Sequence, residues 1–339
     1  MKILFAYRGT RQRDFDRLAT YPTSHMSEVN DVQLCHAWRE MGHEVDVWVE
    51  KDGEPDPSKY DLLYLFKLHS VQKFIAAGLL KLPWKRVAAW YDFGKLAQAC
   101  GDERHNLESV AWGTPGLMEQ EKGSLPGAKQ LVAEHATTFP APPALPETQP
   151  RGLYIGRVPN AYRVQVEMAS GYAPLNIFAL KLELGGRMLL FRHGQYDDAA
   201  LTEAQRWASD YRCTFSPGVN LIADPSVAVG CFGLVPSTKY STERQVLSAC
   251  KAWDYWALGL PVVCADNVPE AEWVRQRPML GLLYKVGDEL SMQRAIEAAL
   301  ERAQAVDFAE HREALQSWTF ASHTWRHRAE EIAHAQFTP

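Results

Sequence analysis

Short apolar runs alternate with segments of helical periodicity along much of this chain of 339 residues. The first apolar run covers residues 2–7. A segment with apolar side chains at helical spacing follows at residues 27–42 and ends in a glycine, and an alternating strand pattern comes next at residues 43–49. A strand, a helix and a second strand in this order form the repeating unit of doubly wound sheets, so we expect an α/β fold.

The same alternation continues through the first half of the chain and begins again in the second half. We expect further strands at residues 62–66 and 87–91, with a helix near 71–80 between them. In the second half we expect strands at 152–156, 188–191, 227–234 and 261–265, and helices at 243–258 and 291–304. The chain therefore predicts two Rossmann-like domains, whose ligands bind beyond the carboxyl ends of the strands.

A proline-rich segment separates the two halves. Residues 140–150 contain five prolines, which is too many for a helix or a central strand and is typical of a stiff linker. We place the domain boundary there, with an N-terminal domain over residues 1–145 and a C-terminal domain over 151–320. A last helix within residues 321–339 is expected to pack back toward the N-terminal domain. Two domains also agree with the chain length, which exceeds the usual size of one core.

Composition excludes several classes of protein. A formal net charge of −5 gives no overall attraction to polyanions. The six cysteines lack zinc-binding spacing and are interpreted as reduced thiols. No apolar run approaches the roughly 18 residues that a membrane-spanning helix needs. We therefore expect a cytoplasmic protein whose membrane contact, if it has any, is peripheral.

One local segment departs from this charge balance. Residues 67–86 contain five basic and no acidic side chains, interleaved with apolar ones. Such a segment could contact an anionic membrane surface or DNA. A core helix with solvated lysines is the alternative interpretation, and it is the one that we favour.

The stretch YIGRVPNAYR, residues 154–163, offers a first candidate for phosphate binding. An expected strand ends at Gly156 and Arg157, and Arg163 follows six residues later. A glycine lets a ligand approach the backbone, and two guanidinium groups can bind a pyrophosphate through charge-assisted hydrogen bonds. The alternative interpretation is a strand end with two solvated arginines.

The stretch ACKAWDYWALGLPVVCA, residues 249–265, has the pattern of a helix, a glycine stop and a buried strand. Lys251 and Asp254 are three residues apart and so share one face of the expected helix. The ammonium can bind phosphate there, and the carboxylate can accept hydrogen bonds from ribose hydroxyls. An ordinary ion pair on the helix surface is the alternative.

Taken together, these segments resemble retaining glycosyltransferases of the GT-B type, in the large group that includes family 4. Those proteins show a Gly-Arg strand end with a basic residue six positions later, a segment ending in Pro-Ser, and an acid before a Gly-x-Pro-Val-Val turn. Gly156 and Arg157 with Arg163, then Ser237 at the end of VGCFGLVPS, then Asp254 before GLPVV occur here in the same order. The resemblance implies a GT-B fold, in which two Rossmann-like domains face each other across a cleft.

The resemblance also implies roles for individual residues. Arg157 and Arg163 would hold the donor diphosphate and act in catalysis, and Asp254 would bind the ribose of the nucleotide. Gly156, Ser237 and Lys251 would line the same donor site, and Gly9 would lie in the loop that reaches the donor phosphates. The N-terminal domain would bind the acceptor and supply any catalytic histidine, for which His69 and His105 are candidates.

The chain departs from the pattern of this group at three positions. Arg163 stands where a lysine is usual, and Asp254 is shorter than the usual glutamate. Val246 occupies the position of a second carboxylate. The contact to the donor sugar is the part of the site that this last change affects.

The sequence thus predicts an enzyme, a retaining hexosyltransferase that uses a UDP-sugar or a GDP-sugar, with UDP favoured. The acceptor would be a hydroxyl on a glycan, a lipid-linked sugar or a small molecule. No permanently bound cofactor and no metal are expected, because the Asp14-Phe15-Asp16 triplet follows no strand. Two alternatives stay open: a phage-type transferase acting on hydroxymethylpyrimidine bases in DNA, and a non-catalytic GT-B subunit that binds a partner.

Overall fold

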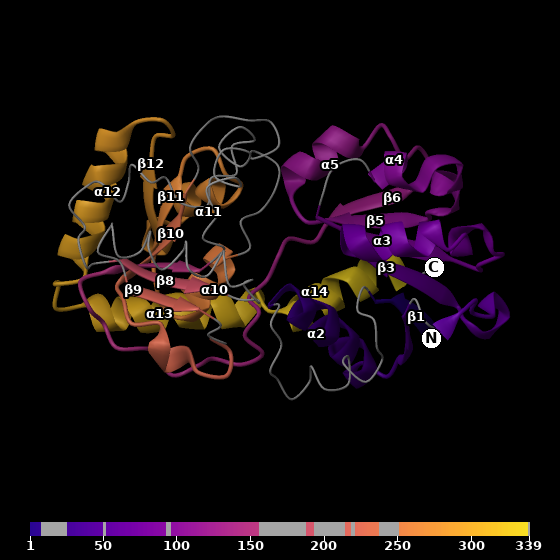
Figure 1. Cartoon of the computed structure of the whole chain (residues 1–339), viewed down its shortest axis with the longest axis horizontal. Helices are drawn as coiled ribbons and strands as arrows, with labels where there is room; N and C mark the ends of the chain where they lie inside the picture. Colours follow the sequence, from indigo (N-terminus) through magenta and orange to yellow (C-terminus); the bar gives the residue numbers. More distant parts are fainter. Residues whose placement is uncertain are drawn as a thin grey trace. The chain divides into compact units, whose positions relative to one another are not determined.

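The chain forms two compact units (Figure 1). The computed structural model describes residues 1–7, 26–49, 52–92, 96–155, 188–192, 214–217, 221–236 and 251–337. Unit 1 comprises Met1–Thr23, Ser27–Ala136 and Trp325–Pro339, and unit 2 comprises Ser24–Met26 and Thr137–Thr324. Apart from the three residues Ser24–Met26, the chain enters unit 2 after Ala136 and leaves it after Thr324, and we call these two points the crossings.

The described part of unit 1 contains a parallel sheet in the order β2-β1-β3-β4-β5-β6. Its strands are β1 (Lys2–Ala6), β2 (Glu44–Trp48), β3 (Leu62–Phe66), β4 (Val87–Tyr91), β5 (Ser109–Trp112) and β6 (Lys129–Val132). The four predicted strands are confirmed, and β5 and β6 are additional. Strands β3 and β4 are buried along their whole length, which explains their uninterrupted apolar sequences.

Helices connect these strands. They are α2 (Met26–Glu40), α3 (Lys67–Ala76), α4 (Leu96–Cys100) and α5 (Pro115–Glu121). The predicted helix near residues 71–80 was placed too late. Helix α3 begins directly at the end of β3, and it ends before Gly78, whose φ of 72° is a left-handed conformation that glycine adopts without strain.

Unit 1 is completed by residues from the far end of the chain. Helix α14 (Trp325–Ile332) lies beside α2 (Figure 1), and the Trp38 indole donates a hydrogen bond of 3.0 Å to the Ala329 carbonyl. Phe337 packs on the Trp38 ring with centroids 4.9 Å apart. Trp325, Ala329 and Ile332 are fully buried in the same core. The core of unit 1 thus depends on side chains that follow unit 2 in the sequence.

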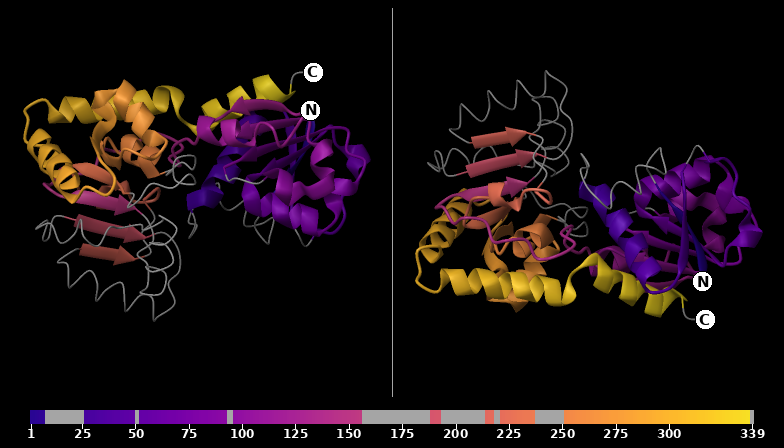
Figure 2. Two further views of the ribbon diagram at one scale, coloured as in Figure 1. Left: turned by 90° about the horizontal axis from the view of Figure 1, so that it is seen from above. Right: turned by 90° about the horizontal axis from the view of Figure 1, so that it is seen from below.

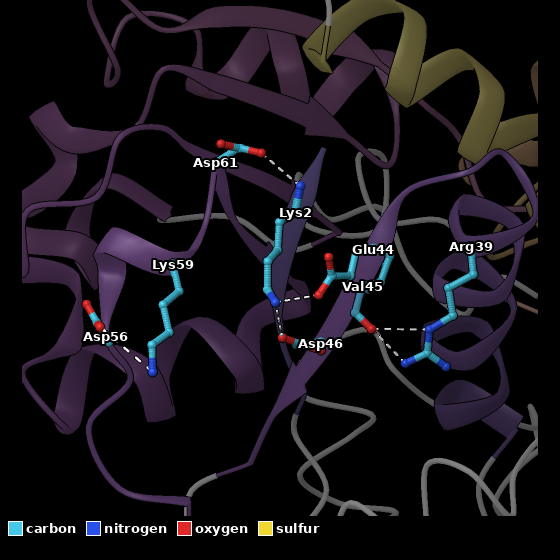
Figure 3. Close-up of polar contacts among 8 residues, drawn as sticks. All are labelled: Lys2, Arg39, Glu44, Val45, Asp46, Asp56, Lys59 and Asp61. Carbon is cyan, nitrogen blue, oxygen red and sulfur yellow. Dashed lines mark hydrogen bonds and ion pairs between the residues drawn. The ribbon is translucent and has the colours of Figure 1, made fainter.

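Charged side chains link the amino ends of the first three strands (Figure 3). The Lys2 backbone donates to the Asp61 carboxylate at 2.9 Å, and its ammonium contacts Glu44 and Asp46. The Arg39 guanidinium donates to the Val45 carbonyl at 2.7 and 3.2 Å. Because these groups are partly exposed, each ion pair contributes little to stability.

The described part of unit 2 contains a second parallel sheet, in the order β12-β11-β10-β7-β8-β9. Its strands are β7 (Gly152–Ile155), β8 (Met188–Arg192), β9 (Thr214–Pro217), β10 (Phe232–Val235), β11 (Val262–Ala265) and β12 (Gly281–Tyr284). Figure 2 shows β8 beside β7, with β9 at the edge of the sheet. Numbered within the unit, the order is 3-2-1-4-5-6, which is the order of dinucleotide-binding domains.

The helices of unit 2 agree with the sequence pattern in part. Helices α10 (Lys251–Ala257), α11 (Glu270–Gln276), α12 (Glu289–Arg302) and α13 (Phe308–Ser322) are described, whereas residues 243–250 of the predicted helix lie outside the described residues. The strand predicted at 227–234 begins only at Phe232, because Pro225–Val227 form a 3-10 turn before it.

The proline-rich segment is held against unit 2 along much of its length. Gln316 on α13 donates to the Pro143 carbonyl at 2.9 Å and to the Ala257 carbonyl at 2.8 Å. Arg312, one turn earlier and buried, donates to the carbonyls of Pro146 at 2.8 Å and Gly259 at 3.1 Å. These bonds tie the segment to α13 and to the turn after α10.

Candidate functional site

The sheet of unit 2 has a topological switch point between β7 and β10. Strand β7 pairs with β8 on one side and with β10 on the other, so the connections after β7 and β10 depart in opposite directions. In such sheets ligands bind outside the carboxyl ends of these two strands. Their last residues are Ile155 and Val235.

One side chain of α10 fills the space between these two strand ends. The Tyr255 hydroxyl accepts a hydrogen bond of 2.7 Å from the Ile155 N–H and donates one of 3.3 Å to the Leu234 carbonyl. Burial raises the pKa of Tyr255 far above its ordinary value, so the phenol keeps its proton. A Cβ atom on Gly233 would lie 2.1 Å from the Tyr255 ring, which explains the glycine in β10.

Lys251 begins α10 at the same place. Its ammonium lies 4.4 Å from the centre of the Tyr154 ring and 3.4 Å from the Tyr154 hydroxyl. Tyr154 belongs to β7, one residue before the strand ends. The structure therefore brings a cation close to the carboxyl end of β7.

Asp254 has different contacts, although it shares α10 with Lys251. Its Oδ1 atom accepts hydrogen bonds from the Thr137 hydroxyl at 3.1 Å, the Thr138 N–H at 2.7 Å and the Thr138 hydroxyl at 2.8 Å. Burial raises the pKa of Asp254 to about 6, and the three hydrogen bonds oppose that rise. Asp254 thus binds the residues at which the chain enters unit 2.

The other predicted donor-site residues, Gly9, Gly156, Arg157, Arg163 and Ser237, lie outside the described residues. Their positions in the sequence still relate them to the switch point. Gly156 directly follows the last residue of β7, and Ser237 follows β10 by two residues. Their roles remain predictions.

Unit 1 has its own switch point, between β1 and β3. Lys67 directly follows β3 and has a φ of 65°, the one positive φ of a non-glycine residue in the described ranges. Such strained backbone conformations cluster at functional sites. The buried Lys67 ammonium lies 3.4 Å from the Asp31 carboxylate on α2, and 4.9 Å from the centre of the Phe66 ring.

A histidine and a carboxylate lie near this pair. The His135 ring, almost fully buried, has its Nε2 atom 3.7 Å from the carboxylate of Asp92, which directly follows β4. Burial, with smaller contributions from Lys67 and Arg328, lowers the pKa of His135 to about 3. The imidazole is therefore neutral at physiological pH.

The sequence interpretation missed this cluster of Asp31, Lys67, Asp92 and His135. Two of its members could have been predicted as site residues, because Lys67 and Asp92 each come directly after a predicted strand. His69 belongs to the first turn of α3, and His105 lies exposed in the 3-10 turn Gly101–Asn106.

The turn that carries His105 precedes β5. The Asn106 amide donates to the Leu80 carbonyl at 3.1 Å, and Glu108 pairs with Val87 at the start of β4. His105 therefore lies toward the amino ends of the strands, at the opposite edge of the sheet from Lys67 and Asp92. The structure does not bring it to the edge where doubly wound sheets bind ligands.

The basic segment 67–86 uses its apolar side chains within unit 1. Phe74, Leu79 and Leu80 are buried. Four of the five basic residues pair with acids from other elements, as Lys67–Asp31, Lys81–Glu103, Lys85–Asp61 and Arg86–Glu108. These contacts favour a core helix over a membrane or DNA contact. Within the parts of the chain that the structure describes, every helix is too short or too polar to cross a membrane.

Comparison with known proteins adds information about the fold. No family model matches the sequence, and no curated protein matches it significantly. Solved structures match over nearly the whole chain. AviGT4, a glycosyltransferase involved in avilamycin A biosynthesis, is 14% identical with a TM-score of 0.60, and the match covers 99% of this chain and 96% of that one.

Two further structures show the same similarity. A glycosyltransferase from Rickettsia africae is 7% identical with a TM-score of 0.63, over 98% of this chain and 97% of that chain. HepE from Anabaena, solved in complex with UDP, is 12% identical with a TM-score of 0.59, over 98% and 99%. The fold of this chain is that of GT-B glycosyltransferases, as the sequence predicted.

Proposed function

We propose that this chain is a glycosyltransferase that moves a hexose from a UDP-sugar or GDP-sugar to an acceptor hydroxyl, with retention of configuration. The observation that carries the proposal is the switch point of unit 2. Lys251 and Tyr255 lie at the ends of β7 and β10 there, and Gly156 and Arg157 follow β7 directly in the sequence. The UDP bound to HepE, which has the same fold, supports a nucleotide donor.

In this proposal, unit 2 stabilises the leaving group. Arg157, Arg163 and Lys251 neutralise the diphosphate as the bond between it and the sugar C1 breaks, and fixed cations of this kind lower the barrier without a metal. The acceptor oxygen forms the new bond to C1 on the same face, and its proton passes to the departing diphosphate. Asp254 accepts a hydrogen bond from a ribose hydroxyl, and Gly156 and Ser237 would contact the phosphates.

Unit 1 would bind the acceptor, which is a glycan, a lipid-linked sugar or a small molecule. Asp92, whose side chain is 25% exposed, can accept hydrogen bonds from acceptor hydroxyls beside the neutral His135. His69 is the other candidate histidine. It belongs to the first turn of α3, and this helix begins at the same edge of the sheet. Both assignments are supported by position, because Asp92 and the first turn of α3 follow the carboxyl ends of β4 and β3.

Thermal unfolding in the presence of nucleotides tests the donor site. We expect UDP or GDP to raise the melting temperature of the wild type, because a ligand at a hundred times its Kd adds about 2.7 kcal/mol to the free energy of unfolding. In Arg157→Ala this stabilisation should disappear. Arg275→Ala is the matched control, since Arg275 pairs with Glu272 on the surface and should leave the shift unchanged.

Turnover of the nucleotide-sugar tests the activity. We expect hydrolysis or transfer to continue when EDTA is present. Equal stabilisation of Arg157→Ala and wild type by UDP would remove the proposed diphosphate site. Tight nucleotide binding without any turnover would instead favour the non-catalytic, partner-binding alternative.

A further inference from the structure

The carboxylate of Asp254 lies at the place where the chain enters unit 2. Thr137 and Thr138 are the first residues after that crossing, and both donate hydrogen bonds to Oδ1 of Asp254, at 3.1 Å from the Thr137 hydroxyl and at 2.7 and 2.8 Å from Thr138. The Thr137 hydroxyl also accepts a hydrogen bond of 3.2 Å from the Phe139 N–H. The first turn of α10 therefore fixes the conformation of this crossing.

The second crossing is attached to the same residues. The Thr137 N–H donates to the His323 carbonyl at 3.0 Å, and Thr137 forms a parallel bridge with Thr324. The His323 ring stacks on Trp253 with centroids 4.8 Å apart, and Trp253 directly precedes Asp254 on α10. Two adjacent residues of α10 thus hold both segments through which the chain passes between the units.

Fixing the crossings does not require a charge at this position. Burial raises the pKa of Asp254, so the ionised form is less stable inside unit 2 than in water. An asparagine could accept the same three hydrogen bonds through its Oδ1 without a charge to desolvate. No described residue donates a hydrogen bond to the second oxygen, Oδ2. One oxygen is therefore engaged with the crossing, and the other can accept a hydrogen bond from a ligand.

We propose that Asp254 is a positioning residue that couples nucleotide binding to both crossings, with Oδ1 holding Thr137 and Thr138 while Oδ2 receives a hydroxyl of the bound nucleotide. This inference rests on the proposed function, because the ligand is the nucleotide of the donor. A ligand on Oδ2 keeps the carboxylate ionised and in place. The hydrogen bonds to Oδ1 then open less often, and the segment paired with Thr137 is protected as well.

Amide hydrogen exchange measured by mass spectrometry, with UDP as the probe, tests the coupling. In the wild type we expect saturating UDP to slow exchange about tenfold in peptides that cover residues 137–139 and 323–325. In Asp254→Asn we expect those peptides to exchange no faster than in the wild type without UDP, and to respond to UDP far less.

A second variant removes the hydroxyl groups that donate to Oδ1 of Asp254. Thr137→Val with Thr138→Val deletes both hydroxyl donors and leaves the carboxylate able to bind the nucleotide. We expect this double variant to bind UDP about three- to tenfold more weakly and to lose most of the UDP-dependent protection at residues 323–325. Thr319→Val is the matched control, because it deletes a buried hydroxyl that bonds the Leu315 carbonyl on α13.

The outcomes separate the two proposals. If UDP raises the melting temperature but changes exchange at neither crossing, the coupling is wrong and the proposed function stands. If UDP protects both crossings equally in the wild type and in both variants, Asp254 is not the coupling residue. If UDP neither binds nor stabilises the wild type, the proposed function fails, and this inference fails with it.

Discussion

At the scale of single residues, Gly233 shows how a switch point is built. The Tyr255 ring packs directly on its Cα atom and reaches between β7 and β10. We expect Gly233→Ala to lower the free energy of unfolding by about 3 kcal/mol, because a new Cβ would overlap the ring. Gly123→Ala is the control, since nothing lies within 4 Å of the new atom there. Urea denaturation measures both, and equal stability of the two variants would contradict this packing.

The hydroxyl of Tyr255 has a separate effect. In Tyr255→Phe the Ile155 N–H and the Leu234 carbonyl lose their buried partner, and we expect a loss of about 2 kcal/mol in the free energy of unfolding. If the hydroxyl also fixes the strand ends for the donor, UDP affinity should fall in the same variant. A Tyr60→Phe control, at a half-buried position in unit 1, should change neither quantity to the same extent.

Lys67 gives a third test at this scale. We expect Lys67→Met to destabilise unit 1 by about 3–5 kcal/mol, because the buried Asp31 carboxylate loses the ammonium beside it. Adding Asp31→Asn removes the buried charge, so the double variant should be more stable than Lys67→Met alone. Chemical denaturation of the three proteins checks the order, and a less stable double variant would show that the pair is not the dominant interaction of Lys67.

At the scale of elements, the sequence predicts strands with an apolar or alternating pattern well and strands without such a pattern poorly. Strands β3 and β4 are apolar throughout because both faces are covered, and their predicted bounds match the structure. Strand β6 reads KQLV and is partly exposed, so it has no continuous apolar run. Strand β9 reads TFSP, so polar residues interrupt its apolar ones and it ends in a proline. Neither carries a pattern that stands out from a loop.

In the candidate site, too, some features could be predicted from the sequence and others could not. Lys251 and Asp254 could be predicted from a local motif, whereas the partners of Asp254 are 116 and 117 residues away in the sequence. The low pKa of His135 arises mainly from its burial, and Asp31 meets Lys67 only because the fold brings α2 to the end of β3. Burial within the folded unit is the largest cause of both pKa shifts, and no local spacing encodes it.

Helix α13 provides a prediction at this scale, since it holds the proline-rich segment. Arg312 donates to four oxygens, those of Gly259, Pro146, Thr148 and Leu258. We expect Arg312→Met to lower the free energy of unfolding by about 3 kcal/mol, because several buried carbonyls lose their donor. Arg275→Met, at an exposed position, should change stability by less than about 0.5 kcal/mol. Protease cleavage within residues 140–150 should also accelerate only in the first variant.

At the scale of the whole molecule, the two units should respond to pH in opposite directions. The pKa of His135 is about 3 in the folded state against 6.5 in the unfolded chain. Between these two pH values the unfolded chain binds a proton at His135 and the folded protein does not. The contribution of His135 to the free energy of unfolding therefore falls by about 1.4 kcal/mol for each pH unit of acidification. The pKa of Asp254 is about 6 in the folded state against 3.8 in the unfolded chain. The contribution of Asp254 to the free energy of unfolding therefore rises as the pH falls from 6 toward 3.8.

Scanning calorimetry between pH 4 and pH 7 checks this prediction. We expect acid to lower the transition of unit 1, and His135→Phe to reduce that dependence. Asp254→Asn should raise the stability of unit 2 at pH 7 and have less effect at pH 4. A pH dependence that neither variant alters would show that other groups control the response.

The position of α14 has a consequence for how this protein is made. Trp325 and Phe337 complete a core whose strands come from the first 132 residues, and all of unit 2 is translated between them. On the ribosome, unit 1 therefore keeps an open apolar face until residues 325–337 leave the exit tunnel. Nascent chains stalled before residue 325 should bind chaperones through that face, and chains in which residues 325–337 have emerged should not.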